Sequence, residues 1–319
     1  MRLQEIPPDV YATAVLPQTA SLWAGRRDFD TYVADTLEIA HSRYGRRHYR
    51  TVGFFDDRTL LASFKRYERA MHDGSRRLHA FGIGAVFTPP ERRGRGYATA
   101  MLASALDQAR IDGYDVAYLF SDVRPQFYAA IGFSELPSRE ISLRADTLPS
   151  LRLEVARLEE RDWPGVARCF DMRVRGGDAF ARTPLVWEWI RTRIRQQAEH
   201  PSGQQANLVV RHGRGVGAYV LGVRVLERDA YAVDEFGFAD ERAALLVPAL
   251  LRAAAGDLRR VVGWLPPKGA RELLPRGSAR KRRGAILMMA PLSRDGSRLI
   301  KNLLTISGDA DCCWATDHI

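Results

Sequence analysis

Lysine is scarce in this 319-residue sequence, although the formal net charge is +10 and the pI is near 9.8. Arginine supplies almost all of the positive charge, and lysine occurs only at Lys65, Lys268, Lys281 and Lys301. This balance favours arginine-rich coding over a lysine-rich tail that binds nucleic acid. The basic residues are dispersed apart from RGSARKRRG at 276–284, where we expect an exposed loop. Nucleic acid is therefore disfavoured as a partner, and an anionic small ligand would use the same positive field.

Cysteine and long apolar runs are also scarce. Cys169, Cys312 and Cys313 have no CxxC spacing and cannot all pair, so neither a zinc site nor a disulfide framework is indicated. The longest apolar run, AILMMAPL, is far shorter than the roughly 20 residues of a membrane span. The first residues, MRLQEIPPDV, lack the apolar core of a secretory signal. We expect a cytoplasmic protein with no metal and no membrane association, and we leave association of identical chains open.

The order of apolar and turn-forming segments predicts two α/β units of similar size. For the first unit we expect a hairpin, a third strand, a helix, a buried strand, a short helix and a last strand, at 48–57 and 59–71, 77–88, 96–112, 115–122, 125–133 and 139–145. For the second we expect a strand, two helices, three antiparallel strands, a helix and two closing strands, at 151–158, 163–173, 184–197, 207–212, 217–227, 231–238, 241–256, 259–266 and 284–292.

A Pro/Ser segment, TLPS at 147–150, marks the expected boundary between the units. The predicted domains are residues 1–148, residues 149–292 and a C-terminal tail at 293–319 that packs back towards the first domain. The fold class is α/β (α+β), with a mixed, mostly antiparallel sheet flanked by helices in each domain.

The stretch ERRGRGYATAM at 91–101 lies between a predicted strand and a predicted helix. A helix N-terminus has unpaired backbone N–H groups and a partial positive charge, and glycines allow a phosphate to approach that backbone closely. The segment is neither a Walker A loop nor a dinucleotide fingerprint, because no Gly-Lys-Ser/Thr follows and GxGxxG is absent. It predicts a phosphate-binding turn of another kind.

The segment RGRGYA at 93–98 fits the pattern Arg-x-x-Gly-x-Ala, and the later strand DVAYLF and helix FYAAIGF follow it in order. This region, from about 77 to 135, resembles the acyl-CoA core of the GCN5-related N-acetyltransferases (GNAT). The resemblance implies two tandem GNAT-like domains and acetyl-CoA as co-substrate. The coenzyme contacts that it implies are Val86, Phe87, Thr88, Arg93, Gly94, Arg95, Gly96, Tyr97, Ala98 and Ser121.

The resemblance also implies that Tyr128, in FYAAIGF, is the general acid beside the coenzyme sulfur. Many single-domain relatives hold a glutamate on the strand before the loop, but the strand at 77–88 has no carboxylate. Either the amine arrives neutral or the base comes from elsewhere. Tandem relatives that resemble the enhanced intracellular survival (Eis) proteins use the C-terminal carboxylate. We therefore expect Ile319, or failing it Asp317 or His318, to accept the proton.

The core motifs VFTPPERRGRGYATAML and LFSDVRPQFYAAIGF are similar to those of fungal lysine N-acetyltransferases. From the length of the chain we expect no sterol-carrier-like domain of the kind found in the Eis-like proteins. The similarity implies transfer of an acetyl group to a primary amine of a small molecule such as an amino acid, a polyamine or an aminoglycoside. A protein lysine or N-terminal acetyltransferase and a non-catalytic coenzyme A sensor remain alternatives. The candidates to line an acidic acceptor pocket are Asp30, Asp35, Glu38 and Asp122.

The second half lacks an equivalent phosphate loop. It has Asp240 and Glu241 where the pyrophosphate would lie, and these carboxylates favour the helix N-terminus but repel a phosphate. We expect a degenerate, non-catalytic domain that shapes the acceptor site and positions the tail.

Overall fold

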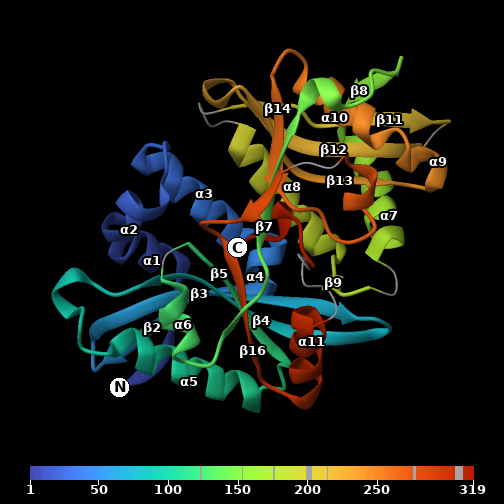
Figure 1. The fold of residues 1–319 in the computed structure, drawn as a ribbon. Coiled ribbons are helices and arrows are strands. Elements are labelled where there is room, and N and C mark those ends of the chain that lie inside the picture. The colour runs from blue at the N-terminus through green and yellow to red at the C-terminus, as the bar shows by residue number, and fades with distance from the viewer. Residues whose placement is uncertain are drawn as a thin grey trace.

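A computed structural model describes residues 1–122, 124–152, 154–174, 177–198, 203–213, 215–275, 278–305 and 312–319. Within these ranges the chain forms two mixed, mostly antiparallel sheets of eight strands each, flanked by helices (Figure 1). The predicted class and the tandem α/β plan are confirmed.

The first sheet lies at the N-terminal end of the chain. Its strands run side by side in the order β1 (Arg2–Ile6), β2 (Tyr49–Asp56), β3 (Thr59–Asp73), β4 (Arg76–Phe87), β5 (Val116–Ser121), β16 (Ile286–Pro291) and β6 (Ser134–Glu135), with β9 (Ala179–Phe180) paired to β3. The second sheet has the order β15 (Ser278–Lys281), β7 (Arg139–Arg144), β14 (Arg260–Trp264), β13 (Ala230–Phe238), β12 (Gly215–Val225), β11 (Leu208–His212) and β8 (Val155–Arg157), with β10 (Gln204–Gln205) paired to β12.

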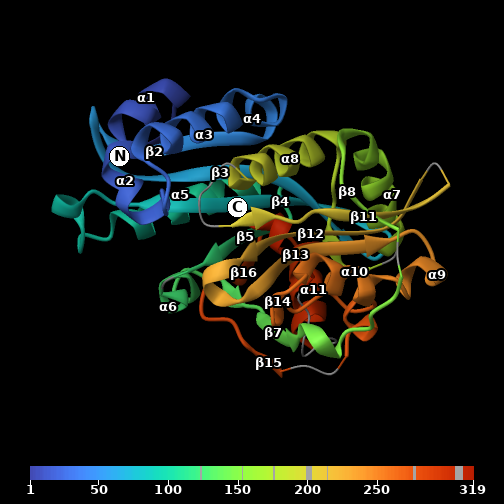
Figure 2. The same ribbon diagram turned by 90° about the horizontal axis from the view of Figure 1, so that it is seen from above.

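Helices flank both sheets. They are α1 (Pro8–Ala14), α2 (Leu16–Trp23), α3 (Phe29–His41), α4 (Arg43–His48), α5 (Tyr97–Ile111), α6 (Pro125–Ala129), α7 (Trp163–Val174), α8 (Pro184–Ala198), α9 (Glu241–Ala244), α10 (Val247–Ala255) and α11 (Arg294–Thr305). The sequence patterns did not suggest α1 to α4; of these, α3 and α4 contact α8, and α1 and α2 pack against α3 (Figure 2). In the described ranges no helix combines the length and the apolar character that crossing a bilayer requires.

Helix α5 shows how local sequence fixes the first domain. Its predicted apolar face is buried, at Met101, Leu102, Ala105, Leu106 and Ala109. That face packs on one side of the sheet, whereas α11 packs on the other side, since alternate residues of β5 and β16 belong to two separate clusters. Both faces of β16 are therefore covered by apolar side chains.

Two strands belong to the sheet opposite to the one predicted. We expected 139–145 to complete the first sheet and 284–292 to complete the second, and both expectations are wrong. Strand β7 pairs with β14 and β15 in the second sheet, whereas β16 pairs with β5 and β6 in the first. The cause is physical: strand patterns record burial, but not which distant strand supplies the hydrogen bonds. Each sheet therefore contains strands from both sides of the predicted boundary at 148.

Three smaller expectations also need correction. The predicted strand at 151–158 is shortened to β8. The single helix expected at 241–256 is divided into α9 and α10, because Pro248 begins a new helix. The basic segment 276–284 is not a simple loop, since its residues Ser278–Lys281 form β15 against β7, while 276 and 277 lie outside the described residues.

Candidate active site

Strand β4 and strand β5 separate at the point where the coenzyme was expected. They pair in parallel from Ala80 to Gly82, and beyond Gly82 the register ends. A bulge follows in β4: its register with β3 shifts between Lys65 and Ser63, and Ala85 has a left-handed φ of 47°. The splayed strands leave backbone groups of β4 without a β5 partner.

A cavity of about 440 Å³ lies in this splay. Its walls come from both strands, from the helices α2, α3, α6 and α8, and from the end of the chain; its lining residues are Trp23, Arg27, Tyr32, Asp35, Thr36, Ile39, Tyr49, Lys65, Tyr67, Gly84, Ala85, Val86, Phe120, Ser121, Asp122, Tyr128, Arg193, Gln196, His318 and Ile319. The fold thus brings together four predicted site residues, Val86, Ser121, Tyr128 and Ile319. Phe87 is instead a buried core residue, and neither it nor Thr88 lines the cavity.

Tyr128 projects from the short helix α6 and is half-buried beside Phe127 and Phe133. Burial, and then the nearby Asp122 carboxylate, raises the pKa of Tyr128 to about 12. The phenol therefore keeps its proton at neutral pH, and a protonated phenol at a reacting centre can donate it.

The phosphate turn lies at the start of α5. Gly94 and Gly96 have left-handed φ values of 74° and 76°, so each glycine provides backbone freedom that other residues lack. Among the described residues no side chain caps this helix, which leaves its first amides free to bind a ligand. Arg93 and Arg95 are exposed, and Arg93 Nε donates to the Thr88 carbonyl at 3.1 Å, which braces the turn.

The chain end lies between the two sheets (Figure 1). The carbonyl carbon of Ile319 is 3.8 Å from the position that a Cβ on Gly84 would occupy, so the terminal carboxylate lies against β4. Arg193 of α8 donates to the His318 carbonyl. Burial, followed by the Arg193 and Arg282 charges, lowers the pKa of His318 to about 3, so its ring stays neutral.

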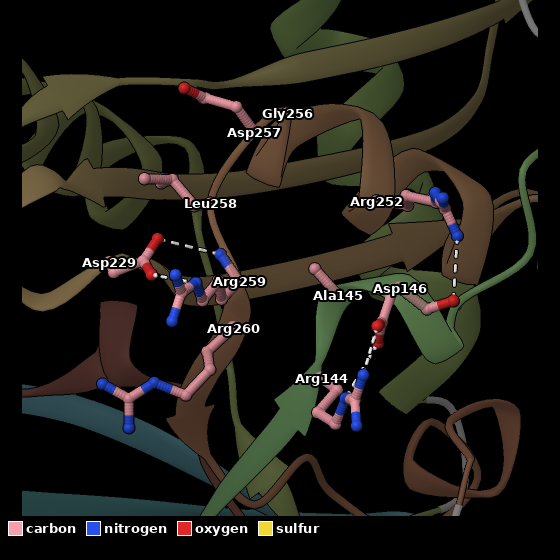
Figure 3. Close-up of a pocket in the computed structure, with 10 residues that line it drawn as sticks. All are labelled: Arg144, Ala145, Asp146, Asp229, Arg252, Gly256, Asp257, Leu258, Arg259 and Arg260. Carbon is pink, nitrogen blue, oxygen red and sulfur yellow. Dashed lines mark hydrogen bonds and ion pairs between the residues drawn. The ribbon is translucent and has the colours of Figure 1, made fainter.

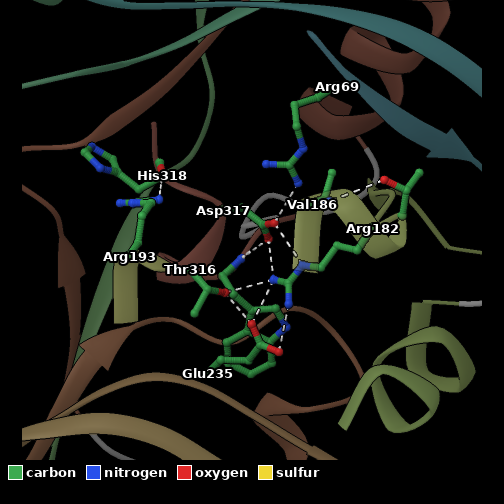
Figure 4. A network of polar contacts seen from close by, with 10 residues as sticks. Arg69, Arg182, Val186, Arg193, Glu235, Thr316, Asp317 and His318 are labelled. Carbon is green, nitrogen blue, oxygen red and sulfur yellow. Dashed lines mark hydrogen bonds and ion pairs between the residues drawn. The ribbon is translucent and has the colours of Figure 1, made fainter. Parts of the chain in front are cut away.

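Asp317 is the anchor of this tail and not a free base. Its carboxylate is buried and accepts from Arg69 of β3 at 3.1 Å and from Arg182 at 3.0 and 3.1 Å (Figure 4). Arg182 also donates to Glu235 of β13 at 3.0 Å and to Thr316 at 2.8 Å. One ion-pair network therefore joins both sheets and the tail. Asp317 does not line the cavity, so the expectation that it could serve as base is wrong.

The acidic candidates for the acceptor pocket are only partly confirmed. Asp35 and Asp122 line the cavity, whereas Asp30 and Glu38 do not. Glu38 instead binds Gln196 at 2.8 Å, and Arg27 holds Asp35 at 3.0 Å. Lys65 was missed. Its signal was available, since it follows the apolar run LLASF in a predicted strand of a lysine-poor chain. Burial, and then the Arg27 charge, lowers the pKa of Lys65 to about 8.

A larger hollow of about 800 Å³ lies in the second domain, between β7, β14 and α10 (Figure 3). Its arginines are engaged by neighbours, with Arg144 paired to Asp146 at 2.5 Å and Arg259 to Asp229 at 3.2 Å. It contains none of the predicted site residues. At the start of α9, Asp240 accepts from the Ala243 amide at 2.8 Å, so a carboxylate occupies the place of a phosphate as predicted.

Comparison with known proteins agrees with this geometry. A family model of the acetyltransferase (GNAT) domain matches residues 24–136. No curated protein sequence matches the chain. A probable N-acyltransferase of Enterococcus faecalis is similar over 92% of this chain and 73% of its own, at 14% identity and a TM-score of 0.72.

Two further solved structures have the same fold. Eis1 of Mycobacterium abscessus is similar over 77% of this chain and 64% of its own, at 16% identity and a TM-score of 0.56. A tandem GNAT protein from the clavulanic acid biosynthesis pathway covers 92% and 99%, at 11% identity and a TM-score of 0.50. Residues 24–136 therefore match the acetyltransferase (GNAT) domain, and the chain as a whole has the fold of the tandem, Eis-like GNAT proteins.

Proposed function

We propose that this protein is an acetyl-CoA-dependent N-acetyltransferase that acts on a primary amine of a small molecule. The observation that carries the proposal is the convergence of three features on one cavity. The bulged end of β4, the protonated phenol of Tyr128 and the carboxylate of Ile319 all line it. An acetyl transfer needs a polarising donor, an acid and a base, and these features supply one of each.

Acetyl-CoA would supply the activated acetyl group. The free amides at the start of α5, with Arg93 to Ala98, would hold its pyrophosphate, and Val86, Thr88 and Ser121 would contact its pantetheine arm. A backbone N–H of β4 would polarise the thioester carbonyl. The carboxylate of Ile319 would take the proton of the attacking amine, and Tyr128 would give its proton to the sulfur when the carbon–sulfur bond breaks.

The volume of the cavity favours a small acceptor over a protein. Its acceptor side is walled by α3 and α8, and Gln196 of α8 donates to the Asp35 carbonyl of α3 at 3.2 Å, which joins the two helices. A volume of about 440 Å³ is typical of a small-molecule pocket.

The test is thiol release from acetyl-CoA against panels of amino acids, polyamines, aminoglycosides and peptides. We expect Tyr128→Phe to lower kcat by about 100-fold, the lower end for a general acid, while the acetyl-CoA Kd stays within about twofold. Deleting His318 and Ile319 should act in the same way. Tyr114→Phe is the matched control, because Tyr114 also has a pKa raised to about 12, mainly by burial, but does not line the cavity.

Each result has a definite meaning. Undiminished turnover in Tyr128→Phe would remove the acid role, and undiminished turnover after the deletion would remove the carboxylate as base. Tight acetyl-CoA binding without turnover on any amine would indicate a sensor. Turnover confined to peptides would indicate a protein acetyltransferase.

A further inference from the structure

Lys65 places a cation on the acceptor side of the cavity. It lies in β3 directly opposite Gly84 of β4, and residues in register share a face of the sheet. The Ile319 carbonyl carbon lies on that same face, 3.8 Å from the position of a Cβ on Gly84. Lys65 and the carboxylate proposed as base therefore flank one position of β4, and both line the cavity.

The ammonium of Lys65 has no ion-pair partner in the part of the chain that the structure describes. Within the described residues no hydrogen bond or ion pair engages it, and its neighbours are the rings of Tyr11 and Tyr49, whose centroids are 5.8 and 6.0 Å away. The other cations of the cavity are engaged, because Arg27 binds Asp35 and Arg193 binds the His318 carbonyl. A half-buried ammonium without an acid is costly unless a ligand compensates for it.

Of the two tyrosines, Tyr49 lines the cavity beside Lys65, whereas Tyr11 belongs to the core and does not line it. The hydroxyls of Tyr11 and Tyr49 are buried and have no partner within the described ranges. Burial raises the pKa of both phenols, so each keeps its proton and remains a donor. Asp35 is already neutralised by Arg27, and Asp122, at the exposed edge, accepts from the Ala285 amide at 2.9 Å. The cavity beside Lys65 thus offers the Tyr49 hydroxyl as a further donor, and the Ile319 carboxylate on the same face is reserved for the amine as the proposed base.

We propose that the acceptor carries an anionic group beside its primary amine, and that Lys65 binds this group. The inference rests on the proposed function and names its substrate class: an amino-acid-like acceptor. With the amine at Ile319 and the anion at Lys65, such a molecule is held at both ends, whereas Lys65 repels a polyamine or an aminoglycoside.

The experiment compares acceptors that differ only in the anion. L-lysine is paired with cadaverine, L-ornithine with putrescine, and phosphoethanolamine with ethanolamine, so that the last pair distinguishes a phosphate from a carboxylate. In the unmodified protein, kcat/KM should be at least tenfold higher for the anionic member of a pair, since a hydrogen bond between charged groups discriminates by about that factor. Lys65→Met should abolish the difference, and Lys65→Arg should keep most of it.

Lys65→Glu should reverse the preference towards the diamines. Lys301→Met is the control, because Lys301 is exposed on α11, and it should change nothing. Equal kcat/KM within every pair, or a preference that survives Lys65→Met with acetyl-CoA binding intact, would overturn the inference. So would an acetyl group found on Lys65 itself by mass spectrometry. Acetyl-CoA binding without any amine turnover would instead overturn the proposed function, so the two failures are distinguishable.

Discussion

Individual side chains hold the chain end in one place. Arg182 contacts Asp317, Thr316 and Glu235, and all four residues are buried. Removing a single partner from such a network leaves an uncompensated charge, which typically costs about 3–5 kcal/mol. A network that is satisfied in only one geometry specifies the tail position, and so it fixes where the last two residues meet β4.

His318 should make stability depend on pH. Its folded pKa of about 3 is below the value of about 6.5 in an unfolded chain, so between these values the unfolded state binds more protons. Stability should therefore fall as the pH drops from about 6.5 to 3, by at most ~1.4 kcal/mol per pH unit. His318→Gln should show a smaller loss of Tm between pH 7 and pH 5.

Asp234 acts in the opposite direction, because burial raises its pKa to about 7 and the folded state then binds the extra proton. Asp234 is present in both the unmodified protein and His318→Gln, so the difference between their Tm profiles reports on His318 alone. Identical Tm profiles for the two would contradict the buried, neutral imidazole.

Single elements were the part of the fold that the sequence predicted well. Helix α5 and strand β5 carry their own signals, an apolar stripe closed by Asp112-Gly113 and a continuous apolar run. The sheet membership of β7 and β16 had no such signal, since it depends on pairing between segments far apart in the sequence. Lys65 was missed for a similar reason: its position in β3 is local, but the cavity beside it is built from distant segments.

The two ends of α5 provide a matched test of the phosphate turn. Gly96 and Gly113 have φ values of 76° and 81°, and a Cβ at either would meet open space. Alanine should therefore cost a similar ~1 kcal/mol of stability at each, through backbone strain alone. We expect Gly96→Ala to raise the acetyl-CoA Kd by about tenfold or more, and Gly113→Ala to leave it unchanged. Equal Kd values by calorimetry would place the pyrophosphate elsewhere.

At the scale of the whole molecule, the exchange of β7 and β16 ties the two halves together. Removing β16 would expose the β5 edge and uncover both clusters to which its residues belong. The ion-pair network of the tail also spans β3 and β13. Each sheet therefore needs at least one strand from the other half of the sequence.

We expect the intact protein to unfold in one calorimetric transition and residues 1–148 alone to show no cooperative transition. Joining residues 284–305 to residue 138 through a flexible glycine-serine linker should restore folding, because it supplies β16 and α11. A cooperatively folded 1–148 fragment would contradict this account. Failure of the joined chain, with the intact protein stable, would indicate that the second sheet is also required.

Because β16 belongs to the first sheet, that sheet can be completed only late in synthesis. Strand β5 leaves the ribosome long before β16, so the first sheet waits with an open edge while the whole second sheet is being made. A nascent chain in that state is prone to pair its open β5 edge with another chain until β16 has been made. Translation speed through the second half should therefore affect the yield of native protein more than speed through the first.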